Sequence, residues 1–292
     1  MRPTPTNRAE LVFAPSRQPR GMIRFGRSAL AVFGAGCWLA APLHAAEPAG
    51  SPPFAAAWQA LSVGSYEDAG DQFARAGADR QARLGAAIAL INRPPVTPSS
   101  LAEAQHRFTE LARGPDETAH AARYFLGRMQ QLHPIAPDPV AAAREYEALV
   151  ATGADDLWCR LALLKLAILH LTVLPGPGEP AARFAAVEPM LARTQDDLTR
   201  RDLHLVIAEA RMSRRVYDPA TLGHLQAALA ATAPDDALRP DLLVQTGRLA
   251  SLLGDRATVR ASYEAFLRDY PKDRRWYTVN SALAHVDGSF PP

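Results

Sequence analysis

Apolar residues near the C-terminal end of the chain recur at helical spacing. The stripe there consists of Val259, Tyr263 and Phe266. Steps of four and three residues place these side chains on one face of a helix. Ahead of the stripe, Gly247 and Gly254 lie seven residues apart. A glycine within a helix lets a second helix cross closely, and a glycine just after a helix commonly ends it. The pattern predicts a helical hairpin packed along the stripe.

Similar stripes recur along most of the chain. Their central positions are Phe73, Phe108, Tyr146, Val187, Leu225 and Tyr263. The intervals between them are 35, 38, 41, 38 and 38 residues. Prolines, which end helices, gather between stripes at residues 92–100, 133–139 and 174–180. Six units at this spacing predict about twelve helices across residues 54–271, and no alternating run calls for a β-strand.

The last unit resembles the tetratricopeptide repeat, which is about 34 residues long. The resemblance rests on the two glycines, the stripe, and Pro271 at the end of the unit. Residues 138–153 also resemble one Sel1-type unit. Over residues 54–271 the resemblance implies an all-α fold, an α-solenoid of about six helical hairpins wound as a right-handed superhelix. Residues 273–285 are expected to form the capping helix that solenoids need.

In tetratricopeptide arrays the first helix of each hairpin lines a concave groove. In the third unit, anchored by Gly127, the resemblance places Ala121, Tyr124, Arg128, Gln131 and Leu132 in this groove. In the last unit it places Asp241, Val244, Arg248, Ser251 and Leu252 there. We take Tyr124, Arg128, Gln131, Asp241, Arg248 and Ser251 as candidate binding residues. Arg128 and Arg248 occupy equivalent positions, where they would bind peptide carboxylates or serve as plain surface residues.

The stretch 157–174 is apolar enough to be compared with a membrane span. It contains Arg160, Lys165 and His170. Because these residues are five apart, they point in different directions around a helix instead of sharing one face. We therefore expect a central solenoid helix buried by its neighbours.

The N-terminal region has the layout of an export signal. Arg24 and Arg27 precede an apolar stretch, residues 28–41, and Ala45 ends a small-residue cleavage site. We expect a signal peptide at residues 22–45 that starts from Met22, with residues 1–21 untranslated or disordered. Residues 46–53 are expected to form a linker, 54–287 the repeat domain and 288–292 a tail. The mature protein is expected to be periplasmic or secreted; an uncleaved anchor and lipidation at Cys37 are the alternatives.

Removal of the signal changes the charge and the cysteine count. The formal charge is +2. Residues 1–45 hold six arginines and one glutamate, a net +5, so the remainder carries −3. This mildly acidic balance gives no general attraction for nucleic acid. Cys159 is then the single cysteine, so no intramolecular disulfide can form, and we expect it in the core.

Catalytic motifs are missing from the sequence. It has no phosphate-binding glycine loop, no His-Glu-x-x-His and no Gly-x-Ser-x-Gly. The histidines are scattered without metal-ligand spacing along the chain, so we expect surface or half-buried imidazoles. We predict no enzyme activity, no cofactor and no metal.

Two charged patterns invite a structural interpretation. The acid pairs are Asp155-Asp156, Asp196-Asp197 and Asp235-Asp236, each just before an expected long helix. Acids at helix N-termini cap the backbone, so these pairs are expected to be caps. The densest basic cluster is Arg200, Arg201, Arg211, Arg214 and Arg215. It is expected to be a solvated ridge, or else an anionic docking patch.

The leading functional hypothesis is an exported scaffold that binds a protein or peptide in the cell envelope. Residues 266–271 also resemble the repeats of envelope-coordination and outer-membrane assembly proteins. The alternatives are a carrier of a small apolar or glycan ligand within the superhelix, or an enzyme with a nonstandard site. The low aromatic content, 7%, argues against the carrier.

Overall fold

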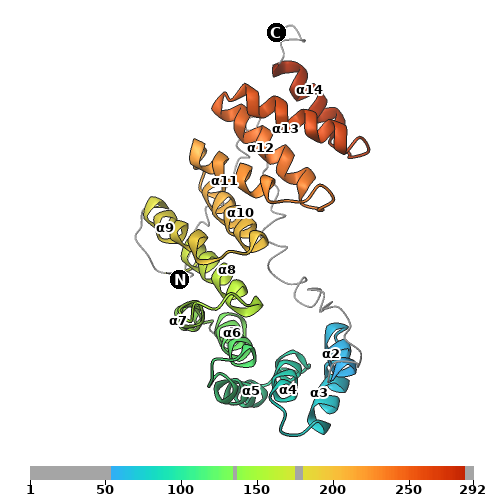
Figure 1. The fold of residues 1–292 in the computed structure, drawn as a ribbon, viewed down its shortest axis with the longest axis vertical. Helices are drawn as coiled ribbons and strands as arrows, with labels where there is room; N and C mark the ends of the chain where they lie inside the picture. Colours follow the sequence, from blue (N-terminus) through green and yellow to red (C-terminus); the bar gives the residue numbers. More distant parts are fainter. Residues whose placement is uncertain (1–53, 134–136, 175–179, 287–292) are drawn as a thin grey trace, which may run out of the picture. The chain divides into compact units, whose positions relative to one another are not determined.

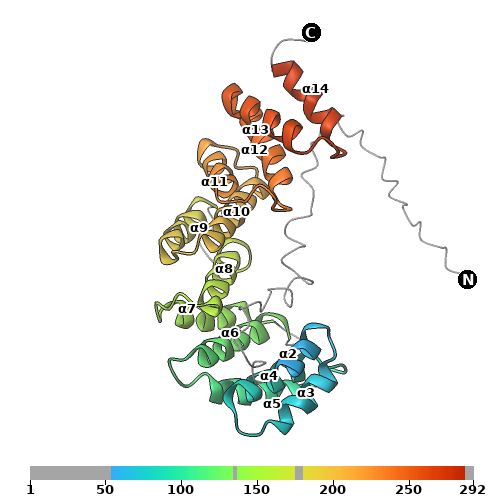
Figure 2. The same ribbon diagram turned by 45° about the vertical axis from the view of Figure 1, so that its right-hand side comes forward.

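The computed structural model describes residues 54–133, 137–174 and 180–286. The predicted signal peptide, the linker up to residue 53, Cys37 and the C-terminal tail lie outside this part of the chain. Within it the protein is all-α, with thirteen α-helices and no strand (Figures 1 and 2). The predicted fold class, an α-solenoid of helical hairpins, is confirmed.

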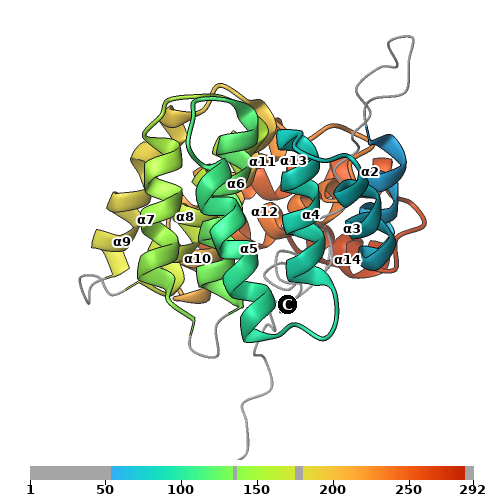
Figure 3. The same ribbon diagram turned by 90° about the horizontal axis from the view of Figure 1, so that it is seen from below.

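The helices alternate along the chain as first and second members of six hairpins. The first helices are α2 (Ala55–Ser62), α4 (Arg80–Asn92), α6 (Glu117–Leu132), α8 (Leu157–Thr172), α10 (Asp197–Ser213) and α12 (Arg239–Leu253). The second helices are α3 (Tyr66–Arg75), α5 (Pro98–Leu111), α7 (Pro139–Val150), α9 (Pro180–Val187), α11 (Pro219–Ala230) and α13 (Arg256–Asp269). Each helix packs mainly on its neighbours in sequence, as α5, α6 and α7 do in Figure 3. The capping helix α14 (Trp276–Val286) packs on α13.

All six central stripe positions lie on second helices, as the spacing predicts. Their side chains are 0–4% exposed. The fourth unit departs from the others, because α9 is short and continues as a 3₁₀ turn, Glu188–Arg193. Phe184 and Val187 of α9 still pack into a core with Leu163 of α8 and Leu203 of α10. The fourth unit therefore keeps the buried stripe although its second helix is irregular.

Three glycines of first helices allow close contact with aromatic rings of second helices. A Cβ atom at Gly127 would lie 2.6 Å from Cε1 of Tyr146, which is too close for any real side chain. Gly247 is similarly close to Tyr263. Gly85 of α4 receives Phe73 from the preceding α3. Tyr146 and Tyr263 therefore pack on a glycine of their own hairpin, whereas Phe73 packs on a glycine of the next hairpin.

Helix ends follow local signals in the sequence. Proline occupies the first turn of α5, α7 and α11. Aspartates cap four of the six first helices, α4, α6, α8 and α10. Asp156 and Asp196 accept backbone N–H groups at the starts of α8 and α10. Asp236 accepts the N–H of Leu238, just before α12. The interpretation of the acid pairs as caps is therefore confirmed for α8 and α10. It is wrong for Asp235-Asp236, because the N-cap of α12 is Leu238, which makes no side-chain cap hydrogen bond. Gly254 ends α12 with a φ of 77°, a conformation that glycine adopts without strain.

Helix α8 corresponds to the apolar stretch 157–174. It buries nine residues against its neighbours. Among the described residues, no helix combines the length and apolar character required to cross a membrane. The expectation of a buried central helix is thus confirmed for α8.

Candidate functional site

The candidate groove residues of α6 divide into a buried and a surface group. Tyr124 is 1% exposed, and Ala121 is also buried. The Tyr124 ring lies 5.6 Å from the ring of Trp158 in α8 and 5.8 Å from that of Tyr146 in α7. Trp158 of the next hairpin covers Tyr124, so Tyr124 is a core residue instead of a surface residue of the groove.

The C-terminal halves of α6 and α12 reach the surface. Leu132 and Leu252 occupy equivalent positions, and each is 51% exposed. Arg128 and Arg248 are half-buried instead of exposed. Arg128 lies over the ring of Phe125 at 5.9 Å. Both helices therefore present an arginine and an apolar side chain at matching places.

Two of the three remaining candidate residues, Gln131 and Asp241, make internal contacts. Gln131 of α6 accepts a hydrogen bond from the hydroxyl of Tyr146 at 3.2 Å. Asp241 of α12 forms an ion pair with Arg275, which comes just before α14. Ser251 is exposed. Asp241 thus helps to hold the cap in place, a role that the resemblance did not indicate.

A second cation lies beside Arg128. Lys165 of α8 is 9% exposed. Its removal from water, and next the positive charge of Arg128, lower the pKa of Lys165 to about 8. Burial and the same arginine lower the pKa of His133. We call Arg128, Gln131, Leu132 and Lys165 the α6–α8 surface. It contains two cationic side chains, Arg128 and Lys165, and Lys165 is one of the two lysines of the chain.

The basic cluster of α10 is not a solvated ridge. Arg211 is buried; its Nε donates to Thr221 at 2.9 Å and its Nη2 to Asp218 at 2.7 Å. Arg201 donates to Asp202 and Asp236. Arg215 lies beyond the end of α10, so it shares no helix face with Arg211. These arginines bind the hairpins together, and neither sequence interpretation of the cluster holds for Arg201 or Arg211.

Arginine and histidine side chains link consecutive first helices through the acids at their N-termini. The pairs are Arg80–Asp116, His120–Asp156, Arg160–Asp196 and Arg201–Asp236. The partners are 36, 36, 36 and 35 residues apart. We call these four pairs the cap ladder. Sequence reasoning recognised the acids but missed their bases, although the recurring 36-residue separation was visible in the sequence.

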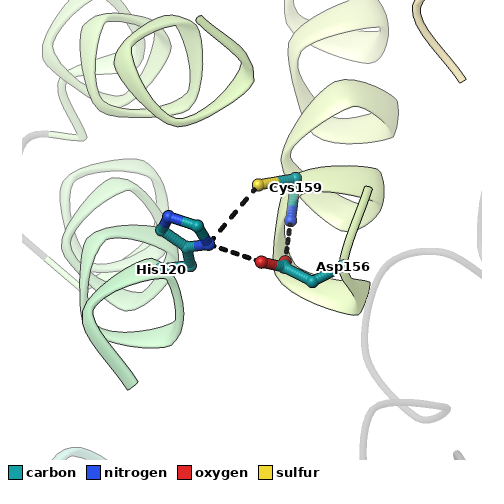
Figure 4. Close-up of side chains that lie close together, drawn as sticks. All are labelled: His120, Asp156 and Cys159. Carbon is teal, nitrogen blue, oxygen red and sulfur yellow. Dashed lines mark hydrogen bonds and ion pairs between the residues drawn. The ribbon is translucent and has the colours of Figure 1, made fainter. Parts of the chain in front are cut away.

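The His120 rung of the cap ladder contains a third polar group (Figure 4). Nδ1 of His120 faces Oδ2 of Asp156 and lies 3.9 Å from Sγ of Cys159. His120 and Cys159 are both buried. Burial raises the pKa of the Cys159 thiol to about 11. The expectation that histidines are exposed or half-buried is wrong for His120, and the core position of Cys159 is confirmed.

This cluster does not have the geometry of a catalytic triad. In a triad the two ring nitrogens of histidine contact different groups, the acid and the nucleophile. Here the same atom, Nδ1, faces both Asp156 and Cys159 (Figure 4). A thiol with a raised pKa is also a poor nucleophile at neutral pH. The three donor groups lie within 4.8 Å of one another, a separation that suits a shared cation better than proton relay.

A cavity of about 540 Å³ lies among α3, α4 and α5. Small residues, including Gly70, Ala74 and Ala86, form part of its lining. Arg83 and Glu110 form an ion pair of 2.6 Å in its wall. The volume is within the range of small-molecule pockets. The cavity could not be predicted from the sequence, because the small residues that leave the space open also occur in helices without cavities.

The hairpins, stripes and cap ladder define the class of protein as an α-solenoid. No protein-family model matches the chain, and no curated protein matches it. A solved structure with some similarity is "Crystal structure of APC/C hetero-tetramer Cut9-Hcn1", with 15% identity and a TM-score of 0.41. That match covers 80% of this chain and 42% of the other, so this chain spans less than half of its length.

Proposed function

We propose that this protein is an exported scaffold of the cell envelope that binds an anionic segment of a partner protein at the α6–α8 surface. The observation that carries the proposal is the pair of neighbouring cations, Arg128 and Lys165. Holding Lys165 largely out of water beside another positive charge disfavours its charged form. A carboxylate from a partner placed there would interact favourably with both cations.

Leu132 gives this surface an apolar contact next to its charges. Half of its side chain is in water. Interfaces commonly combine an apolar anchor with charged hydrogen bonds. A peptide with a carboxylate beside an apolar side chain fits both features. The equivalent Arg248 and Leu252 on α12 repeat the combination, which supports recognition of a segment and not of a lone ion.

Photo-cross-linking tests the binding surface. A photoreactive residue replaces Leu132 on α6, and in a control protein it replaces the exposed Val140 on α7. We expect a discrete protein adduct from position 132 in envelope extract and none from position 140. Adding Arg128→Ala should weaken that adduct at least about tenfold, the loss expected for one charged hydrogen bond. Equal adducts at both positions, or no effect of the arginine, would rule out this surface.

Export rests on the charged and apolar pattern of residues 22–45. N-terminal sequencing of the protein from its native source should find a mature chain that starts close after Ala45. A mature protein that still begins at Met22 would contradict cleavage, and lipid on Cys37 would replace it. The cross-linking result is independent of this outcome.

The alternative, a carrier of a small ligand, is favoured by the cavity among α3, α4 and α5. Its volume of about 540 Å³ is adequate for such a ligand. Native mass spectrometry of the protein from its source distinguishes the two functions. A small molecule that remains bound without any protein adduct at position 132 would favour the carrier.

A further inference from the structure

Three metal-binding side chains meet where α6 and α8 pack together (Figure 4). His120 comes from the first turn of α6. Asp156 is the N-cap of α8, and Cys159 is three residues later in its first turn. One donor atom from each lies within 4.8 Å of the others. Imidazole, carboxylate and thiolate are the ligands that zinc binds in proteins.

The separations suit a single ion. Zinc–sulfur and zinc–nitrogen bonds are about 2.3 and 2.0 Å long, together about 4.3 Å. Sγ of Cys159 and Nδ1 of His120 are 3.9 Å apart, so one ion can contact both. Nδ1 faces Oδ2 of Asp156 at short range, and these two atoms would separate by less than about 1 Å to admit the ion. The required movement is within the reach of side-chain rotation.

Metal binding would leave the helix cap intact, because the two oxygens of Asp156 have different partners. Oδ1 accepts the backbone N–H groups of Trp158 and Cys159, each at 2.9 Å. Oδ2 faces His120. A cavity of about 30 Å³ borders Cys159 and is lined by Gly153, Asp155 and Thr194 among others. This volume is enough for one water molecule as a fourth ligand.

Comparison with the other rungs of the cap ladder separates this site from a plain structural pair. The other three bases, Arg80, Arg160 and Arg201, are guanidinium groups, which have no lone pair for a metal. Three residues after the capping acid, α6 has Ala119 and α10 has Thr199. In α8 that position is Cys159. The rung that has histidine in place of arginine also has cysteine in place of alanine or threonine. Both differences place a metal-ligand side chain in the same rung.

We propose that His120, Asp156 and Cys159 bind one zinc-class transition-metal ion. On binding, the Cys159 S–H bond breaks, its proton leaves to water, and the sulfur electron pair forms the bond to the metal. In the metal-free rung Nδ1–H of His120 donates to the carboxylate Oδ2 of Asp156. On binding this proton leaves Nδ1, the neutral ring carries its hydrogen on Nε2, and Nδ1 and Oδ2 donate the other pairs. No redox step is involved. The ion joins the hairpin that starts with α6 to the one that starts with α8. This inference is independent of the proposed function.

Titration of the purified, metal-free full chain with Co²⁺ tests the site. Thiolate bound to cobalt gives a charge-transfer absorption that a histidine–carboxylate site lacks. We expect this absorption to saturate at one ion per chain and to disappear in Cys159→Ser. Zn²⁺ should displace the cobalt and raise the melting temperature of the native sequence.

The decisive variant is His120→Arg. It reproduces the rungs of Arg80 and Arg160, so the pair with Asp156 and the fold should persist while a ligand is lost. Its metal affinity should fall more than about a hundredfold, beyond the effect of removing a second-shell group. His170→Gln removes another histidine from α8 and should bind normally. An unchanged cobalt signal in His120→Arg, or no thiolate absorption in the native sequence, would overturn the proposal and leave a purely structural rung.

Discussion

Lys165 is the residue whose position is hardest to explain by stability alone. It is the charged side chain of a core helix, beside Arg128, with a pKa lowered to about 8. Because the unfolded chain binds this proton more tightly, stability is lost as pH falls from about 10.5 to about 8, and the loss is complete below that. This pH dependence can be tested by removing the charge.

Lys165→Met should therefore stabilise the protein at neutral pH, on the order of 2 kcal/mol. The gain should shrink as pH rises towards 10.5, where the lysine is neutral in both states. Denaturant unfolding at pH 7 and pH 10 measures it. Lys272→Met, at the exposed second lysine, is the control and should change little at either pH. Destabilisation by Lys165→Met at pH 7 would show that its charge is favourable in the fold.

The glycine of α6 gives a second prediction for a single residue. Gly127→Ala would force a methyl group against the ring of Tyr146 and should cost about 1–3 kcal/mol. Gly223 of α11 has open space where its Cβ would be. Gly223→Ala should stabilise by about 0.5–1 kcal/mol through helix propensity. Thermal melts of both variants check the contrast, which equal shifts would contradict.

Among pairs of helices, α10 and α11 meet at two histidines. Nδ1 of His204 lies 2.9 Å from Nδ1 of His224, and burial lowers the pKa of both. Arg200 lies near His204; Arg211, Glu188 and Asp218 lie near His224. Below pH 6.5 the unfolded chain binds protons that the folded pair resists, so this pair lowers stability as pH falls.

Glu209, which lies on α10 with His204, has the opposite effect on the pH dependence of stability. Burial raises its pKa to about 7, so its contribution to stability increases as pH falls. A comparison of variants separates the two effects. The double variant His204→Gln, His224→Gln should gain stability relative to the native sequence as pH falls from 7 to 5. Urea unfolding at several pH values measures this difference. A constant difference across the range would show that the pair does not couple to folding.

The cap ladder predicts unequal costs for removing aspartate caps. Asp79 accepts two backbone N–H groups of α4 and no side-chain donor from the described residues, so Asp79→Ala should cost about 1 kcal/mol. Asp196 also accepts Arg160 at 2.7 Å and the hydroxyl of Thr199. Asp196→Ala should thus cost more, on the order of 2 kcal/mol. Equal costs in denaturant unfolding would show that the ladder contributes nothing.

Helix order and second-helix faces could be predicted because each depends on residues a few positions apart. The burial of Tyr124 could not, since it depends on Trp158, which comes from the following hairpin. The same holds for His120 and Cys159, which are 39 residues apart in sequence. The helical period predicts which side chains share one face of a helix. It does not predict which neighbouring helix covers that face, and the exposure of the candidate binding residues depends on that neighbour.

Across the whole molecule, stability should be greatest in the middle of the array. Helix α8 has nine buried residues, whereas α14 has one, Val279. Repeats contact mainly their neighbours, so terminal helices are held from one side and open first. Hydrogen exchange followed by mass spectrometry should show slower exchange in α8 than in α14. Uniform protection would instead indicate a single cooperative unit.

The cap ladder also bears on how such an array changes length in evolution. In three rungs each first helix offers an acid to the unit before it and a base to the unit after it, always at a separation of 36 residues. A duplicated or deleted whole unit would therefore meet matching charges at both new junctions. A duplication or deletion that begins inside a unit would place like charges, or no charges, opposite each other at the new junction. The direction reverses at the end, where Asp241 of α12 pairs with Arg275, so the last hairpin is not interchangeable with the others.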